Sequence, residues 1–493
     1  MVVLQLTKLD TANDRVVLCP SFVFSLPTDW TEEDGDSLVT QIREAAERVV
    51  KKWPVLAALP TKSERGLWLL DIPNNVELAA LGRPLFTLTT SAIDEPYHLA
   101  AGLSPPPPPF SSLPSCILPR PDYSLFRHPS RPATLEQHAS ASAPLLSIHI
   151  TLTSDAVCIG VSVAHGAFDG TGLGMILKAL DAELHGREWD VPPYNEGNPF
   201  TQALAKLSTE SSPEPQAPAT APPLLWSSWT PKTWLSSLRF RLSAWWEKTW
   251  HQSETRWVFI RQEAVNKLVA STKKEVVQVT GGAEYVSSGD VLLAWLSKAF
   301  YSDDYSSTDS LNASAVYSAR PLLAPLVPIL TLYPHTAKFP YTLFHRPLPL
   351  NTLNSMSVAE LSLLIRRALP LYRKLPAVQA MWTGTSSSPP LLPVRSWPGL
   401  VSFLLHHVFG IEHIHRLLFS NQTSCNLAGL SLPNPAAKSK ADLPLHAYFM
   451  TAEGPKELDG VVVWQQTHEG ITVKGTMRKR RWEGMERALR QLK

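Results

Sequence analysis

The sequence is short of cysteine, of long apolar runs and of net charge. Its four cysteines are scattered along 493 residues and form no C-x-x-C pair, which predicts reduced thiols in a reducing compartment. They are Cys19, Cys116, Cys158 and Cys425. No segment approaches the roughly 20 uninterrupted apolar residues of a membrane span. Because Lys8 and Asp10 interrupt the start of the chain, no signal-peptide core forms there either, and we expect a cytoplasmic protein.

The charge balance also narrows the possible partners. Lysine and arginine number 45 and aspartate and glutamate 43, so the net charge of +2 gives no reason to expect a nucleic-acid partner. Apolar residues make up 44% of the chain, which is enough for sizeable buried cores. A length of 493 residues exceeds a usual single core, so two domains are expected. Both halves mix strand-like and helix-like segments, which indicates a layered α/β (α+β) fold.

The boundary between the domains is predicted from composition. Residues 208–223 are rich in serine, proline and alanine, and this composition predicts a linker. We therefore expect an N-terminal domain over 1–207, a linker and crossover over 208–255, and a C-terminal domain over 256–493. The proline-rich segment 103–121 is expected to be a surface loop.

A tryptophan-rich segment, 225–257, allows two interpretations. Trp234, Leu238, Leu242 and Trp245 would share one face of a helix. Such a helix could make a weak contact with a membrane surface. It could equally be a crossover segment packed on the protein itself.

Apolar periodicity predicts the main elements of both halves. Helices are expected over 36–52, 173–184, 263–274, 291–300, 358–369 and 483–492, and strands over 16–24, 66–72, 85–90, 145–153, 156–164, 256–261, 313–318, 460–464 and 470–476.

The stretch 161–174, VSVAHGAFDGTGLG, carries the sharpest chemical signal. A β-branched run leads to His165, Asp169 and Gly170 follow at fixed spacing, and an apolar helix-like segment comes next. Histidine has an ordinary pKa of about 6.5, so one held at the end of a strand can act as a general base near neutral pH. The glycines allow close backbone approach or a positive φ angle. The other interpretation is a histidine that merely satisfies a polar turn.

Other catalytic and metal-binding patterns are missing. There is no phosphate-binding G-x-x-x-x-G-K-[ST] loop, no dinucleotide G-x-G-x-x-G after a strand and no G-x-S-x-G nucleophile elbow. The four histidines of the segment LLHHVFGIEHIHR lack a complete ligand pattern, so we expect no metal site and place them at the surface or along a channel. They are His406, His407, His413 and His415. The basic run MRKRR at 477–481 could hold phosphates or form a solvated face.

HGAFDG resembles the H-x-x-x-D-G motif of the BAHD-type acyl-CoA-dependent acyltransferases, in their fungal branch. Further segments resemble the same family: KKWPVLAALP, SSGDVLLAWLSKAF and VYSARPLLAP. The resemblance implies two chloramphenicol-acetyltransferase-like domains with a channel between them. It implies acyl-CoA, with acetyl-CoA as the first candidate, as co-substrate with no tightly bound cofactor, and a small-molecule acceptor of secondary metabolism. A monomer is expected.

The resemblance also implies roles for single residues. His165 would deprotonate the acceptor hydroxyl or amine, which then attacks the thioester. Asp169 would be structural and paired with Arg320 of the second domain, and Gly170 would serve the turn. No residues can be assigned to CoA binding.

One departure from the family is the absence of its D-F-G-W-G string. The corresponding place is 418–432, where Ser420, Asn421 and Gln422 are candidates for oxyanion-stabilising or substrate-contacting groups. A simple polar turn is the alternative.

Two other functions stay open. The missing string allows a non-catalytic ligand-binding protein on the same scaffold, although an intact His165 argues against it. A condensation-type enzyme using carrier-bound thioesters usually has a doubled histidine, and Ala164 stands in that place.

Overall fold

A computed structural model describes the chain except for residues 1, 8, 15, 75–76, 78–81, 104–105, 119, 121, 195–197, 211–252, 302–308, 345, 387–413, 437–440, 451–459 and 493. Most of the predicted linker 208–255 and of the tryptophan-rich segment 225–257 lies outside the described residues, as do His406, His407 and His413.

The first of two large sheets is built mainly from the N-terminal half. Its strand order is β15-β3-β9-β8-β6, with β2 pairing beside β3 on β9. The bounds are β2 Val17–Leu18, β3 Pro20–Ser25, β6 Thr87–Ala92, β8 Ser147–Leu152, β9 Ala156–Ala164 and β15 Leu445–Met450. β8 and β9, predicted as strands over 145–153 and 156–164, form an antiparallel hairpin in register from Ser147 opposite Ser162. All nine residues of β9 are buried, so this strand is the rigid centre of the sheet.

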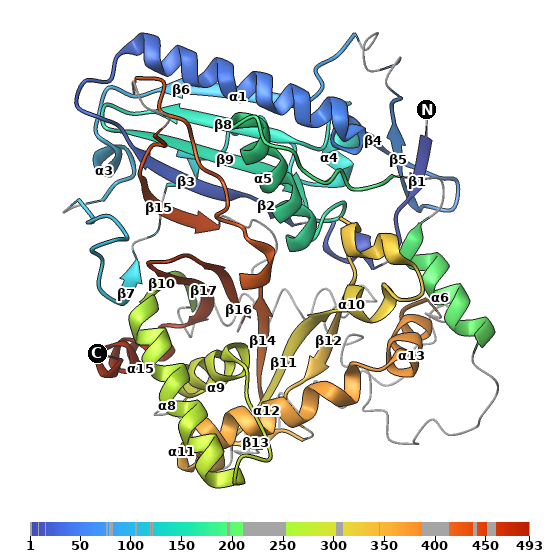
Figure 1. Cartoon of the computed structure of the whole chain (residues 1–493), viewed down its shortest axis with the longest axis vertical. Helices are drawn as coiled ribbons and strands as arrows, with labels where there is room; N and C mark the ends of the chain where they lie inside the picture. Colours follow the sequence, from blue (N-terminus) through green and yellow to red (C-terminus); the bar gives the residue numbers. More distant parts are fainter. Residues whose placement is uncertain are drawn as a thin grey trace, which may run out of the picture.

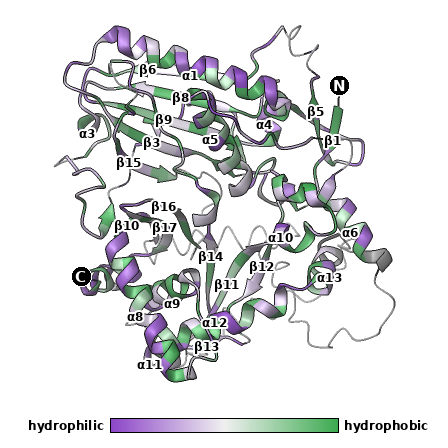
Figure 2. Ribbon diagram, viewed as in Figure 1, coloured by the Kyte–Doolittle hydropathy of each residue, from purple (hydrophilic) through white to green (hydrophobic). Residues whose placement is uncertain are grey.

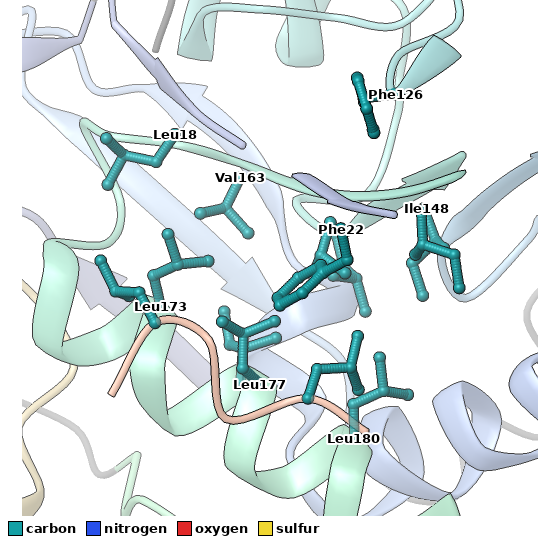
Figure 3. Packing of buried hydrophobic residues seen from close by; sticks show 14 of the residues in the cluster. Leu18, Phe22, Phe126, Ile148, Val163, Leu173, Leu177 and Leu180 are labelled. Carbon is teal, nitrogen blue, oxygen red and sulfur yellow. The ribbon is translucent and has the colours of Figure 1, made fainter. Parts of the chain in front are cut away.

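Helices α1 (Glu32–Lys52) and α5 (Gly170–Leu184) lie together against this sheet (Figure 1). Leu173, Leu177 and Leu180 of α5 point toward Phe22 and Val163 of the strands, so the helix is fixed by a continuous apolar contact (Figure 3). That contact places the N-terminus of α5 directly after the end of β9.

α1 begins four residues earlier than predicted, because its capping box lies upstream of the apolar periodicity. The Thr31 hydroxyl accepts from the Asp34 backbone N–H, and the Asp34 carboxylate accepts from the Thr31 backbone N–H. Such a box satisfies two N–H groups that otherwise lack partners at the first turn.

The second large sheet is built mainly from the C-terminal half, in the order β12-β11-β14-β16-β17-β10-β7, with the short β13 beside β11. Its strands are β7 Cys116–Leu118, β10 Ser253–Arg261, β11 Ser310–Ser318, β12 Lys338–Thr342, β13 Leu348–Pro349, β14 Ile414–Asn421, β16 Gly460–Gln466 and β17 Gly470–Arg478. The strands predicted over 460–464 and 470–476 are confirmed as β16 and β17, which pair antiparallel. Helices α8 (Gln262–Thr280), α9 (Ser288–Tyr301), α12 (Val358–Tyr372) and α15 (Lys479–Gln491) pack around it.

Each large sheet contains a strand from the other half of the chain. β15 comes from residues 445–450 but pairs with β3, and β7 comes from 116–118 but pairs with β10. Figure 1 shows β15, coloured as a late segment, beside the early strands. The two halves are therefore joined by backbone hydrogen bonds as well as by side-chain packing. The boundaries predicted at 207 and 256 stay a prediction.

The remaining elements are smaller or were not predicted. They are β1 Val2–Gln5, β4 Leu59–Lys62, β5 Trp68–Ile72, α3 Tyr97–Ala100, α4 Leu135–Ser140, α6 Pro199–Glu210, α10 Arg320–Leu323, α11 Leu350–Ser355, α13 Leu375–Ser386, and the 3-10 turns η1 Asp10–Asn13, η2 Pro54–Ala57, η3 Tyr123–Leu125, η5 Pro328–Leu332 and η6 Thr423–Cys425. β1, β5 and β4 form a third sheet.

The hydropathy of the residues differs between the inner strands and the outer helix surfaces. Apolar residues predominate on the central strands, and polar residues occupy the outward side of α1 (Figure 2). Among the described helices, none combines the length and the apolar character that crossing a membrane requires.

Candidate active site

His165 lies directly after β9, where the strand turns into α5. Its backbone N–H donates to the Val16 carbonyl, 2.8 Å away, which extends the pairing of β2 with β9 by one residue. Since all of β9 is buried, the backbone that carries His165 is held rigidly. The His165 side chain itself is half-buried.

The hydrogen bonding of His165 determines its tautomer. Nδ1 lies 2.9 Å from the Phe168 carbonyl oxygen. A carbonyl can only accept, so Nδ1 carries the proton and Nε2 keeps its lone pair. Within the part of the chain that the structure describes, no hydrogen bond engages Nε2. Burial lowers the pKa of His165 below its ordinary value, against the opposing effect of the Phe168 carbonyl, so the ring is neutral near pH 7. A neutral imidazole with a free Nε2 is suited to accept a proton.

Asp169 caps α5 and does not contact the imidazole ring by a hydrogen bond. Its Oδ1 accepts from the backbone N–H groups of Thr171 (2.8 Å) and Gly172 (3.1 Å). The Asp169 side chain is completely buried. Asp169 therefore shapes the turn that follows His165.

Arg320 reaches Asp169 from the other half of the chain, as predicted. Its Nη2 lies 2.9 Å from Asp169 Oδ2, and its side chain is 5% exposed. Nη2 also donates to the His335 carbonyl oxygen at 2.5 Å, so one guanidinium nitrogen contacts both the carboxylate and the segment that carries His335. Burial alone would raise the pKa of Asp169, but the positive charges of Arg320 and Lys338 hold it below its usual value.

The segment 333–336 surrounds this ion pair. Arg320 Nε donates to the Tyr333 carbonyl at 2.8 Å, and the Pro334 carbonyl accepts from the Asp169 backbone N–H at 3.4 Å. His335 Nδ1 donates to the Ala167 carbonyl at 2.5 Å, and its ring stacks on Phe168. Burial lowers the pKa of His335 to about 4, so this histidine is neutral and serves as a packing and hydrogen-bonding group.

Two glycines of α5 allow the second half of the chain to approach its backbone. A Cβ atom on Gly172 would lie 2.1 Å from the Pro334 carbonyl oxygen, and one on Gly174 would lie 1.8 Å from the Cys425 carbonyl oxygen. Neither glycine has a positive φ angle. Of the two uses of glycine expected from the sequence, close approach is therefore the one that applies.

The three polar candidates of the 418–432 segment separate in the structure. Gln422 lies beside the turn, and its Oε1 accepts from Lys338 Nζ at 2.6 Å. Ser420 reaches the turn only through Gln422, whose Nε2 donates to Ser420 Oγ at 2.5 Å. Asn421 instead accepts from the backbone and hydroxyl of Thr423 and stabilises the η6 turn. Ser420 and Asn421 end a strand, which the polar-turn alternative did not include.

Sequence reasoning did not identify Lys338, His335 or Asp10. Asp10 is fully buried, and its Oδ1 accepts from the Thr336 backbone N–H at 2.7 Å. Burial raises the pKa of Asp10 to about 7, although donors from Thr7 and Thr336 oppose that change. These residues belong to no recognisable motif, and the order of hydrophobic strands gives no information about which polar residues meet.

His415 and the basic run 477–481 lie apart from this site. Arg481 is buried and donates to His415 Nδ1 at 3.0 Å, and His415 Nε2 in turn contacts Asp309 at 3.0 Å. His415 is therefore a core residue and not a surface or channel histidine. Among the described residues, no cluster of three histidine, cysteine or acidic side chains could hold a metal ion.

The arrangement combines a neutral histidine on a rigid strand end with a buried ion pair that fixes the turn beside it. Such a histidine can remove a proton from an alcohol or amine. Among the described residues, no serine or cysteine is hydrogen-bonded to His165.

Comparison with known proteins places the site in context. No family model matches the chain. The O-acyltransferase pboC of Aspergillus ustus is 33% identical over 179 residues, 36% of this chain and 35% of that protein. The acetyltransferase adrJ of Penicillium roqueforti is 26% identical over 285 residues, 53% of this chain and 51% of that protein. A transcriptional regulator, sdnM of Sordaria araneosa, is 27% identical over 266 residues, 52% of this chain and 50% of that protein. The alignments thus span about a third to a half of these curated relatives.

Similarity to solved structures covers almost the whole chain. The structure of TRI101 from F. sporotrichioides with coenzyme A and T-2 gives a TM-score of 0.62 at 12% identity, covering 99% of this chain and 97% of that one. Vinorine synthase gives a TM-score of 0.54 at 11% identity, covering 99% and 93%. The predicted two-domain acyltransferase fold is confirmed. The chain is a sequence relative of fungal acyltransferases and has the fold of TRI101 and vinorine synthase.

Proposed function

We propose that the chain is an acyl-CoA-dependent acyltransferase. It transfers an acyl group, with acetyl as the first candidate, from the CoA thioester to a hydroxyl or amine of a secondary metabolite. The observation that carries this proposal is the state of His165. Its Nδ1–H is donated to the Phe168 carbonyl, its Nε2 is hydrogen-bonded to none of the described residues, and burial keeps the ring neutral.

In the proposed reaction His165 Nε2 removes the proton from the acceptor O–H or N–H. The acceptor atom then bonds to the thioester carbonyl carbon, and the C–S bond breaks as the tetrahedral intermediate collapses. The proton held on His165 passes to the departing CoA sulfur, so the enzyme returns to its starting state. General-base catalysis of this kind contributes about 10²–10⁴ in rate.

The ion pair between Asp169 and Arg320 would act on this reaction indirectly. It holds the first turn of α5 against the segment 333–336, and that segment in turn holds Ala167 and Phe168 through His335. The Phe168 carbonyl then stays in place to select the tautomer of His165. Asp169 and Arg320 are thus positioning residues.

The names and titles of relatives support the choice of substrates. pboC and adrJ are named as an O-acyltransferase and an acetyltransferase, and TRI101 was solved in complex with coenzyme A and T-2 mycotoxin. We include in the proposal a small-molecule acceptor, a monomeric state, a cytoplasmic location, and domains over 1–207 and 256–493. The membrane-surface contact of 225–257 stays a prediction.

A panel assay tests the activity. Purified protein would be mixed with acetyl-CoA and hydroxylated or amino acceptors such as terpenoids, polyketides and alkaloids. Release of the CoA thiol would be followed together with the mass of the product. We expect thiol release that depends on the acceptor and matches a mass increase of one acetyl group. Absence of both with every acceptor and with longer acyl-CoA donors would contradict the proposal.

A non-catalytic ligand-binding protein is the second candidate, because a matched relative is named as a transcriptional regulator. Calorimetry separates the two. Binding of CoA supports the transferase, whereas binding of an apolar small molecule without affinity for CoA favours the scaffold.

A further inference from the structure

The hydrogen bonds of Gln422 show which group beside the turn can stabilise negative charge. Lys338 Nζ lies 2.6 Å from Gln422 Oε1, and an ammonium group can only donate, so the amide oxygen faces the lysine. The Cys425 thiol also donates to that oxygen at 3.2 Å. The amide nitrogen points the other way, to Ser420 Oγ. Gln422, a sequence-based candidate for an oxyanion donor, therefore offers its acceptor atom to this side of the site.

Lys338 has N–H groups that form no hydrogen bond with the described residues. Its ammonium carries three N–H groups, and Gln422 is its one hydrogen-bond partner among the described residues. The side chain is half-buried at the start of β12, which keeps its charge only partly screened by water. Lys338 enters the site two residues after the segment 333–336, which is itself fixed to Arg320 and Asp10.

The ammonium lies against the first residue of α5. A Cβ atom on Gly170 would be 3.3 Å from Lys338 Nζ and 2.2 Å from Gln422 Oε1, so only glycine leaves room for this pair. Gly170 comes five residues after His165 and directly after Asp169. The positive charge of Lys338 is felt at both: it lowers the pKa of His165 and of Asp169.

We propose that Lys338 is a second catalytic residue, whose ammonium donates to the thioester carbonyl oxygen and stabilises the oxyanion of the tetrahedral intermediate, and that Gln422 positions it. This inference rests on the proposed acyltransferase function. As the acceptor oxygen bonds to the carbonyl carbon, the carbonyl π electrons move onto oxygen, and Lys338 lies ready to neutralise that charge. When the intermediate collapses, the electrons return and CoA leaves as the thiolate, which takes the proton from His165.

A positive charge beside a general base affects two steps: the protonation of the base and the formation of the oxyanion. It disfavours a proton on His165 before the acceptor arrives. It then stabilises the negative charge that forms on the carbonyl oxygen, and one such donor contributes about 10²–10³ to kcat. The charged groups that act on His165 from the neighbouring elements are Asp169 at the start of α5, which raises its pKa, and Lys338 on β12, which lowers it.

The test compares Lys338→Met, Lys338→Arg and Gln422→Met with the wild type in the acetyl-CoA assay. Lys206→Met is the control, because Lys206 bonds to the Leu326 carbonyl away from the site. We expect Lys338→Met to lose about 10²–10³ in kcat, with each KM changed less than about threefold. Lys338→Arg should restore part of kcat, and Gln422→Met should lose less than Lys338→Met.

A second readout needs no turnover. The pH dependence of diethyl pyrocarbonate modification at His165, followed by peptide mass spectrometry, reports its pKa. It should be higher in Lys338→Met than in the wild type, and circular dichroism checks that the variant folds. An unchanged pKa of His165 would overturn the inference, as would an unchanged kcat. A loss confined to the KM of an acidic acceptor would also overturn it and indicate an acceptor-binding lysine. An inactive wild type would instead contradict the proposed function.

Discussion

Arg320 Nη2 lies 2.9 Å from Asp169 Oδ2, and both side chains are withdrawn from water. Removing one member leaves an uncompensated buried charge, which costs about 3–5 kcal/mol. Arg320→Met should therefore lower the free energy of unfolding by about that amount, as measured by urea denaturation. The double variant Asp169→Asn/Arg320→Met should be more stable than Arg320→Met alone. Equal stability of the single and double variants would show that the two charges are not coupled.

The pH dependence of the rate follows from the state of His165. Its pKa is lowered by burial, so the base is already neutral below the ordinary histidine pKa of about 6.5. We expect kcat/KM to rise with pH through that lowered pKa and to reach a plateau by about pH 7. A profile that still rises above pH 8 would contradict this assignment of the base.

Asp10 should make stability depend on pH in an unusual direction. Burial raises its pKa from 3.8 to about 7, so the folded protein binds this proton more tightly than the unfolded chain does. The contribution of Asp10 is present in full below about pH 4 and is lost as the pH rises to about 7. The slope of unfolding free energy between pH 4 and pH 7 should thus be more negative in the wild type than in Asp10→Asn, whose side chain does not titrate. Parallel slopes would contradict the raised pKa.

Gly174 is the residue where α5 and the Cys425 backbone approach most closely. A methyl group there would lie 1.8 Å from the Cys425 carbonyl oxygen, and neither backbone can move without shifting its element. We expect Gly174→Ala to cost at least about 1–3 kcal/mol in unfolding free energy. Gly82→Ala is the control, since none of the described residues lies within 4 Å of its Cβ position and the change should be nearly neutral. Thermal unfolding of both variants checks the difference.

Much of the site could be predicted because its residues form a local motif. His165, Asp169 and the helix after them lie within twenty residues, and a strand followed by a helix is visible in the apolar periodicity. Arg320 was found through the family resemblance of its turn. Their contact at 2.9 Å is the predicted one, whereas the roles of these residues stay predictions.

The remaining features depend on contacts between distant segments. Lys338 and Gln422 are 84 residues apart and meet only because β12 and η6 both face the first turn of α5. β15 is not among the predicted strands, and nothing in its sequence indicates that it pairs with β3, more than 400 residues earlier. The start of α1 was missed for a different reason, because its capping residues precede the apolar pattern.

One measurement tests the central claim most directly: the initial rate of CoA thiol release by the wild type and by His165→Gln, at the same pH and with the same acceptor. Glutamine keeps a polar side chain of similar size but cannot take a proton near neutral pH. The account predicts a loss of about 10²–10⁴ in rate with unchanged folding. A His165→Gln variant that retains the wild-type rate would contradict it.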